Sequence, residues 1–313
     1  MSDKHSLPPF KLEFLHPRYW LLWLGVGLFR LILWLPYPVL LKLGHGLSWL
    51  FMHLNIGKRR ARIARRNLEL AFPHKSAQER EAILAQNLRA VGMAIIETGM
   101  AWFWPDWRIK KWSTISGLEH LKAHSQGGII FVGVHFLTLE LGARIIGLVH
   151  PGVGVYRPND NKVFDWIQYR GRIRSNKMLL DRKDLRGILK ALKNNDTVWY
   201  APDHDYGRKN AVFVPFFGVQ DAATTTGSYY LIKANDNVAV VPFAPLRNAD
   251  GSGYHVSISQ PVIFNHGESK EEVAAQMNKV VEREIEKDVT QYMWLHRRFK
   301  TRPEDGMASY YDD

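Results

Sequence analysis

The 313-residue chain contains no cysteine, and the short motifs that mark several common enzyme classes are also missing. Without cysteine, the protein has no disulfide and no cysteine-ligated zinc or iron–sulfur site. It has no G-x-S-x-G elbow, no Walker loop and no H-E-x-x-H motif, which argues against a serine hydrolase, a P-loop NTPase and a zinc protease. The pairs Gly25-Val-Gly27 and Gly152-Val-Gly154 lack the third glycine of a dinucleotide-binding loop.

Acidic residues are scarce relative to basic ones: 30 Asp and Glu stand against 42 Lys and Arg, a formal net charge of +12. Such an excess implies an anionic partner, which is a nucleic acid, an anionic lipid surface, a phosphorylated substrate or an acidic protein. The 11 tryptophans favour the lipid surface, because indole rings prefer membrane–water interfaces. No folded nucleic-acid-binding motif accompanies the charge, so we expect no nucleic-acid partner.

The apolar run at residues 19–35 has 17 residues with one charge, Arg30, and is shorter than the roughly 20 residues that a spanning helix needs. Three structures fit it: a buried core helix, a short tilted span and a deep interfacial helix. We expect residues 1–38 to form a membrane-anchoring helix. A second apolar stretch follows at residues 39–54.

Basic residues then cluster at positions 58–66, with six Lys or Arg in nine residues. They form either a solvated helix face or a contact with anionic lipid headgroups. A capping box at Ser76-Ala-Gln-Glu79 predicts a long helix that runs towards Trp102 and ends before Pro105. Residues 39–126 are therefore expected to be helical and close to the membrane. The aromatic patch at residues 100–107 is either a membrane-facing lip or a corner of the core.

From residue 127 onward, apolar strands alternate with helices, which predicts a mixed, largely parallel sheet flanked by helices. We expect an α/β catalytic core over residues 127–303 and a flexible tail over 304–313. The predicted strands are 128–134, 152–156, 197–201 and 238–243, with an edge strand within 254–264. The predicted helices lie near 139–149, 160–171, 183–193, 224–234 and 268–287.

His135 and Glu140 stand where the first of these strands ends and a helix begins, which is where α/β folds place their chemistry. Five helical positions are about 500°, so the two side chains would diverge by roughly 140° if both were helical. They meet only if His135 lies in the turn and Glu140 in the first helical turn. The glutamate would then hold one ring nitrogen while the other takes a proton from a hydroxyl. The alternative is a surface histidine beside a helix-capping carboxylate.

Two further polar clusters fall near predicted strand ends. The first, at residues 169–177, contains Arg172 and Arg174 and is either a solvated basic loop or a cradle for substrate phosphates, which the arginine fork fits. The second contains Asp203, His204 and Asp205. Two carboxylates at this spacing are a weak signal for a metal. We therefore expect no metal, and we expect these carboxylates to fix the loop and pair with arginines.

Several stretches together resemble the lysophospholipid acyltransferase superfamily, and within it the late acyltransferases of lipid A biosynthesis. The H-x4-[DE] motif follows a strand, with an arginine block and a Pro-Asp block downstream. The resemblance runs from about residue 12 to residue 303. It rests on Leu15-His-Pro-Arg-Tyr-Trp20, Glu97-Thr-Gly-Met-Ala-Trp-Phe-Trp-Pro-Asp106, Val134-His-Phe-Leu-Thr-Leu-Glu-Leu-Gly142, Val155-Tyr-Arg-Pro-Asn-Asp160 and Gln291-Tyr-Met-Trp-Leu-His-Arg-Arg-Phe-Lys-Thr-Arg-Pro303.

The resemblance implies an enzyme of the bacterial inner membrane whose active site faces the cytoplasm. It implies acyl transfer from acyl carrier protein to the hydroxyl of a 3-hydroxyacyl chain on Kdo-bearing, tetra-acylated lipid A precursor, with no cofactor. The His204-Asp205 pair is more similar to the lauroyl than to the palmitoleoyl enzymes. Two alternatives stay open: a glycerophospholipid acyltransferase of the same superfamily, and a non-catalytic membrane protein that binds anionic lipid.

For an acyltransferase we expect His135 to be the general base and Glu140 to orient its imidazole, as the carboxylate of a catalytic triad does. Arg172 is the candidate for stabilising the oxyanion or gripping a phosphate. Asp203 is expected to fix Arg172 or the active-site loop. The candidate substrate contacts are Tyr156, Arg157, Arg174, Asn176 and Lys177.

Overall fold

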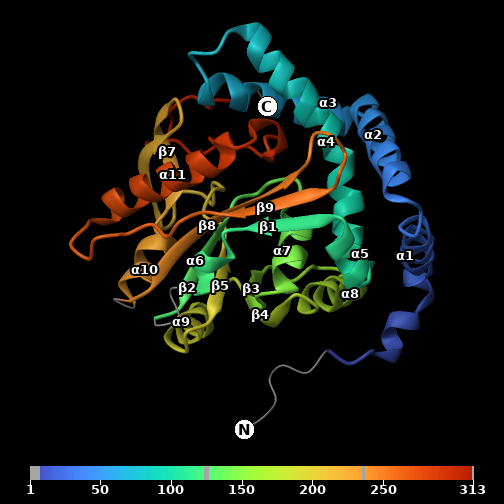
Figure 1. Ribbon diagram of the computed structural model, residues 1–313. Helices are drawn as coiled ribbons and strands as arrows, with labels where there is room; N and C mark the ends of the chain where they lie inside the picture. Colours follow the sequence, from blue (N-terminus) through green and yellow to red (C-terminus); the bar gives the residue numbers. More distant parts are fainter. Residues whose placement is uncertain (1–7, 123–126, 235–236, 312–313) are drawn as a thin grey trace.

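A seven-stranded sheet runs through the protein, which the computed structural model describes over residues 8–122, 127–234 and 237–311 (Figure 1). The strand order is β1-β9-β8-β2-β5-β3-β4, and neighbouring strands are parallel except for the antiparallel pair β8 and β9. The strands are β1 (Ser113–Ser116), β2 (Ile129–Gly133), β3 (Gly152–Tyr156), β4 (Asn176–Asp181), β5 (Thr197–Tyr200), β8 (Ala239–Arg247) and β9 (Tyr254–Ile258). Strands β6 (Ala211–Phe216) and β7 (Val219–Thr225) form a separate antiparallel hairpin.

Helices cover both faces of the sheet, as the alternation of strands and helices predicted. The helices are α1 (Trp20–Ile32), α2 (Tyr37–His53), α3 (Asn55–Ala71), α4 (Ala77–Phe103), α5 (Asp106–Lys111), α6 (Leu118–Lys122), α7 (Leu139–Gly147), α8 (Lys162–Ile173), α9 (Leu185–Lys193), α10 (Gly227–Lys233) and α11 (Lys270–Glu286). The mixed, mostly parallel α/β fold expected from the sequence is therefore confirmed.

The central strand β2 shows why its sequence is apolar without interruption. Ile130 and Val132 point to one core, which also contains residues of α3, α9, α10 and α11. Ile129 and Phe131 point to the other core, which contains residues of α4, α7 and α8. A strand buried on both faces gains from an apolar side chain at every position. β2 thereby ends at a fixed place between the two cores, and His135 follows two residues later.

We expected the strand within residues 254–264 to lie at the edge of the sheet, and this prediction was wrong. β9 lies between β8 and β1, and β1 forms the edge. Three of the four residues of β1 are Ser or Thr, Ser113, Thr114 and Ser116. This strand carries almost no apolar signal, so the hydrophobic pattern did not reveal it.

The N-terminal helices cover one side of the molecule and leave an apolar surface exposed. No helix in the described parts of the chain is long and apolar enough to cross a membrane. Leu33 is buried, and both Phe29 and Leu33 pack closely against Gly99 of α4. The outward side chains of this layer are large and apolar, and we call them the apolar face: Trp20, Leu21, Leu24, Leu28, Leu31, Ile32, Trp34 and Leu35, joined by Val39, Leu43, Trp49, Leu50 and Leu54.

Helix α4 begins at the predicted capping box, in which the Ser76 side chain accepts from the Glu79 N–H and the Glu79 carboxylate accepts from the Ser76 N–H. The aromatic patch at its end is a corner of the core, because Trp102 and Trp104 are buried. Trp107 remains exposed.

The last described residue, Tyr311, is packed against the protein, while residues 304–309 before it are exposed. Tyr311 is buried, its hydroxyl donates to Asn67 of α3, and the same hydroxyl accepts from the Phe299 N–H. Part of the segment expected to be a flexible tail therefore packs into the core. Residues 312–313 of that prediction lie outside the described residues.

Candidate active site

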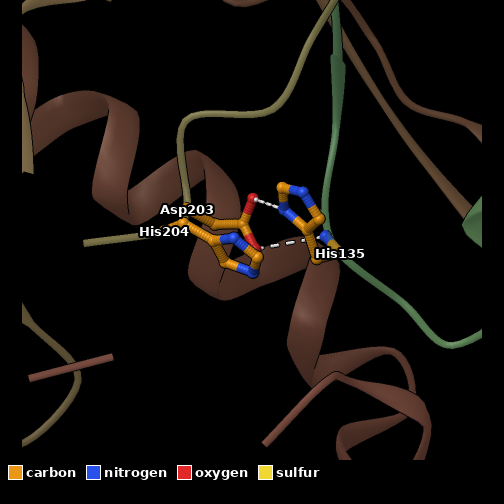
Figure 2. Close-up of side chains that lie close together, drawn as sticks. All are labelled: His135, Asp203 and His204. Atoms are coloured by element: carbon orange, nitrogen blue, oxygen red, sulfur yellow. Dashed lines mark hydrogen bonds and ion pairs between the residues drawn. The ribbon is translucent and has the colours of Figure 1, made fainter. Parts of the chain in front are cut away.

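His135 and Asp203 meet because the two strands that precede them are parallel neighbours. In the β2–β5 pair, Ile129 faces Thr197 and Val132 faces Tyr200, a constant offset of 68 residues. The same offset, carried three residues beyond the paired strands, sets His135 opposite Asp203. Their side chains come together at the carboxyl edge of the sheet (Figure 2).

Asp203 holds His135 at two points. Its Oδ1 lies 2.7 Å from the imidazole Nδ1, and its Oδ2 accepts a 3.1 Å hydrogen bond from the His135 backbone N–H. The Tyr292 hydroxyl donates to Oδ2 at 3.0 Å. The Asp203 side chain is fully buried, while a quarter of the His135 side chain is exposed. Since Nδ1 faces the carboxylate, Nε2 is the ring nitrogen left for a substrate.

Burial and ion pairing shift the pKa values of His135 and Asp203 in opposite directions. Burial disfavours the charged imidazole, but the charge of Asp203 and its hydrogen bond outweigh this, so the pKa of His135 is raised above its usual value. Burial likewise opposes ionisation of Asp203, yet the imidazole and the hydrogen bonds hold the pKa of this carboxyl well below its usual range. The pair therefore favours an ionised Asp203 and a basic imidazole, as a general base requires.

Glu140 does not contact the imidazole, so the expected pairing of His135 with Glu140 is wrong. The Glu140 carboxylate accepts two hydrogen bonds from Arg172 Nε and Nη2, both 2.8 Å, and one of 2.7 Å from Trp102 Nε1. Helix α8 lies very close to Trp102 at Gly171: a Cβ at this position would collide with the indole, so only glycine allows this approach.

The cause of the separation lies in the four residues between the motif's two ends, His135 and Glu140. His135 O accepts from the Met293 N–H, and Leu137 N–H donates to Gln291 O, so this segment is tied to residues 291–293 and α7 begins only at Leu139. Glu140 then faces α4 and α8 instead of the end of β5.

Asp203 likewise does not fix Arg172, because its partners are His135 and Tyr292. The neighbouring Asp205 does fix its loop: it accepts from the Gly207 N–H, the Thr301 N–H and the Thr301 hydroxyl. Among the described residues, neither carboxylate forms the arginine pair that we expected.

His135, Asp203 and His204 place ligand atoms within 4.8 Å of one another. The two imidazole rings, however, are stacked face to face, with centroids 3.6 Å apart and planes 14° apart. The lone pairs of an imidazole lie in its ring plane, so stacked rings do not direct them at one point. His135 Nδ1 is also engaged by Asp203. We assign no metal to this cluster.

Three of the five residues predicted to contact the substrate are bonded to other residues of the protein. Arg174 donates to the carbonyls of Trp102 and Trp104. Asn176 and Lys177 open β4, at the amino edge of the sheet opposite His135, where Asn176 donates to Arg172 O and Lys177 pairs with Asp196.

Tyr156 and Arg157 lie at the carboxyl edge, at the end of β3 and directly after it. Arg157 is largely exposed and lies 3.5 Å from Asp160. These two residues remain candidates for substrate contacts.

The chain is similar to lipid A biosynthesis acyltransferases over nearly its whole length. The family model described as bacterial lipid A biosynthesis acyltransferase matches residues 7–301. The chain is 67% identical to a lipid A biosynthesis acyltransferase of Haemophilus influenzae, over 98% of this chain and 99% of that protein. It is 54% identical to the lipid A biosynthesis lauroyltransferase of Escherichia coli (98% and 99% covered) and 50% identical to the palmitoleoyltransferase of that organism (96% and 98% covered).

Proposed function

The chain belongs to the bacterial lipid A biosynthesis acyltransferase family, and from this premise we propose a specific reaction for it. An acyl chain, lauroyl by preference, passes from acyl carrier protein to the hydroxyl of a 3-hydroxyacyl chain on Kdo-bearing, tetra-acylated lipid A precursor. Its relatives are named as acyltransferases, and transfer to a hydroxyl makes this enzyme an O-acyltransferase. The donor, the acceptor and the chain length are the proposed elements.

The observation that carries the proposal is the His135–Asp203 pair with Nε2 left available. Nε2 takes the proton of the acceptor hydroxyl as its oxygen attacks the thioester carbonyl. The tetrahedral oxyanion then collapses, the C–S bond breaks, and the leaving thiolate takes the proton back from His135. The products are an ester and a free thiol, and the chemistry requires neither a covalent acyl-enzyme nor a cofactor.

We assign to Arg172 a supply of fixed positive charge for this reaction. Nε and Nη2 are occupied by Glu140, while Nη1 has no hydrogen-bond partner in the described parts of the chain. About a quarter of the side chain, 28%, is exposed. A guanidinium held in this way can stabilise the oxyanion or an acceptor phosphate without first having to be ordered.

Charge supports the proposed donor. The net charge of +12 suits an acidic carrier protein. Five exposed cations on and before α9 form no ion pair among the described residues: Arg182, Lys183, Arg186, Lys190 and Lys193. An Arg186→Glu/Lys190→Glu variant should raise KM for acyl carrier protein thioester several-fold and leave KM for the same acyl chain on pantetheine unchanged. The control is Lys110→Glu/Lys122→Glu; equal effects of both variants, or of both donors, would contradict docking at α9.

We propose that the protein lies at the bacterial inner membrane with its active site on the cytoplasmic side, and the apolar face supports the attachment to a lipid surface. Its side chains recur at helical spacing on α1, at Trp20, Leu24, Leu28 and Leu31, all more than half exposed. A soluble surface rarely exposes so large a patch, whereas an interfacial helix buries such a face among lipid headgroups.

Vesicle binding tests the apolar face without disturbing the core. Truncation is unsuitable because it would remove the buried Leu33 and Tyr37. Leu24→Asp/Leu28→Asp should weaken binding to anionic vesicles at least tenfold. Each change removes an apolar side chain that would be buried in the lipid and adds a negative charge. Gln78→Asp/Gln86→Asp makes the same charge change at exposed positions of α4 and should bind as wild type. Equal binding by all three proteins would refute the interfacial assignment.

An acyl-transfer assay tests the reaction itself. Membranes that contain wild-type or His135→Ala protein receive a panel of acyl carrier protein thioesters, with lipid A precursor or a lysoglycerophospholipid as acceptor. We expect one added chain on the lipid A precursor, fastest with lauroyl donor and absent with His135→Ala. Transfer to the glycerolipid alone would overturn the acceptor assignment.

A further inference from the structure

Three imidazole rings are stacked beside the reacting nitrogen, and His204 is the middle one. Its ring lies 3.6 Å from that of His135 with the planes 14° apart (Figure 2). On its other face, the ring of His296 lies 4.3 Å away with the planes 17° apart. The sequence motif accounts for His135 and the strand register accounts for Asp203, but neither accounts for His204.

The surroundings give the three rings different affinities for a proton. Burial, helped by the neighbouring His135, His296 and Arg298, outweighs the attraction of Asp203 and lowers the pKa of His204 to about 3. The pKa of His296 is lowered by burial and by the nearby Lys300, His135 and Arg60. That of His135 is raised. At neutral pH two neutral rings therefore stand beside the one ring that can take the proton.

His204 acts on His135 through the face of its ring. Its Nε2 is fully buried and has no hydrogen-bond partner in the described residues. What it presents to His135 is the face of an aromatic ring. A neutral aromatic face attracts a cation placed over it, and the attraction grows when water is excluded. The charge that arises on His135 during catalysis appears over such a face.

We propose that His204 is a positioning residue, whose neutral ring keeps the His135 imidazole in line with Asp203 and stabilises the positive charge that His135 gains on taking the acceptor proton. Asp203 acts at the edge of the imidazole and His204 at its face. This role rests on the proposed function, because it assumes that His135 is the base.

The buried Arg298 adds to burial and to the neighbouring His135 and His296 in keeping His204 neutral. The Arg298 side chain is 1% exposed, its Nη1 donates to Ala223 O, and its Nε and Nη2 lack partners among the described residues. A permanent cation that is so poorly compensated disfavours a second positive charge nearby. The charged groups that bear on the stack are therefore Asp203 and Asp205, which favour a positive charge on the imidazoles, and Arg298, Lys300 and Arg60, which disfavour one.

His204→Leu and His204→Phe separate the aromatic face from simple filling of space. Both side chains are apolar and uncharged, but only phenylalanine keeps a π face. With leucine we expect kcat on the alkaline plateau to fall about threefold to tenfold and the His135 pKa to fall by about one unit. With phenylalanine we expect both quantities to stay near wild type. Tyr206→Phe, in the same loop, is the control and should change neither.

The readouts are the pH dependence of kcat and the titration of His135 followed by NMR of histidine-labelled protein. Equal behaviour of the leucine and phenylalanine variants would overturn the proposal, as would a loss of rate in His204→Leu without a shift in the His135 pKa. If wild-type protein transferred no acyl chain, the proposed function would fail, but the NMR titration would still test the stabilisation of His135 by His204.

Discussion

Two charged pairs, the His135–Asp203 pair and the Arg172–Glu140 pair, have similar geometry and different chemistry. The first has a contact of 2.7 Å and the second has two contacts of 2.8 Å. An imidazole gains or loses its charge near neutral pH, whereas a guanidinium never loses it. Asp203 is fully buried, while Glu140 keeps 21% of its side chain exposed.

This chemical difference gives the two pairs different roles in catalysis. The His135–Asp203 pair can move a proton, and the Arg172–Glu140 pair can only offer fixed charge and position. The sequence motif His135-x4-Glu140 therefore does not describe one functional unit. Its histidine belongs to the first pair and its glutamate to the second. The following substitutions separate the two pairs, from the largest expected effect to the smallest.

His135→Ala removes the base and should give the largest loss. A positioned base contributes about 10²- to 10⁴-fold to rate, and no other imidazole in the stack has Asp203 at its edge. We expect acyl transfer to fall by about this factor, while circular dichroism and vesicle binding stay unchanged. Substantial transfer by a folded His135→Ala protein would mean that His135 is not the base.

Asp203→Asn keeps the shape of the pair and removes its charge. The imidazole then loses the partner that sets its tautomer, and in catalytic triads such a change costs up to about 10⁴-fold. We expect a loss of about 10³-fold in kcat. The thermal midpoint checks that the protein is folded, and Asp205→Asn is the matched control, with a loss of stability rather than of kcat. Comparable kcat losses in both variants would contradict the assignment.

Arg172→Met and Glu140→Gln should cost less, because they alter fixed charge and leave the proton transfer intact. Loss of an oxyanion contact typically costs about 10²- to 10³-fold, which we expect for Arg172→Met. Glu140→Gln, which leaves Arg172 in place but less firmly held, should cost about tenfold. In the double variant the losses should combine less than additively, since the residues act as one pair. Full additivity would show that Arg172 and Glu140 work independently.

Five strands of the sheet, β2, β3, β5, β8 and β9, were predictable from the sequence, because their apolar runs carry a strong local signal. Strand β2, for example, is an uninterrupted apolar run ended by a polar loop. The polar strand β1 has no such signal and was missed. Strand β4 was missed because its polar start, Asn176-Lys177, falls within the cluster at 169–177 that looked like a phosphate-binding loop. A residue's place along its strand decides which edge of the sheet it occupies, and composition does not report it.

The base was predictable, but its partner was not. His135 stands out locally, and Glu140 was the nearest acid in the sequence. Asp203 lies 68 residues away and meets His135 only because β5 is the neighbour of β2. Strand order is a long-range property that a periodic pattern does not contain. With the order known, the offset of the β2–β5 pair alone would have identified Asp203. Trp102 and Tyr292, which hold the two carboxylates, carried no signal beyond the family resemblance.

The pH dependence of kcat in Asp203→Asn and Glu140→Gln is the most direct test of the claim that Asp203, and not Glu140, is the partner of the base. Wild-type kcat should rise with pH through a pKa above 6.5, because only neutral His135 accepts a proton and Asp203 raises its pKa. In Asp203→Asn the carboxylate that offsets burial is gone, so the pKa should fall below 6.5; in Glu140→Gln it should equal that of wild type. A pKa that moved with Glu140→Gln and stayed in place with Asp203→Asn would contradict the account.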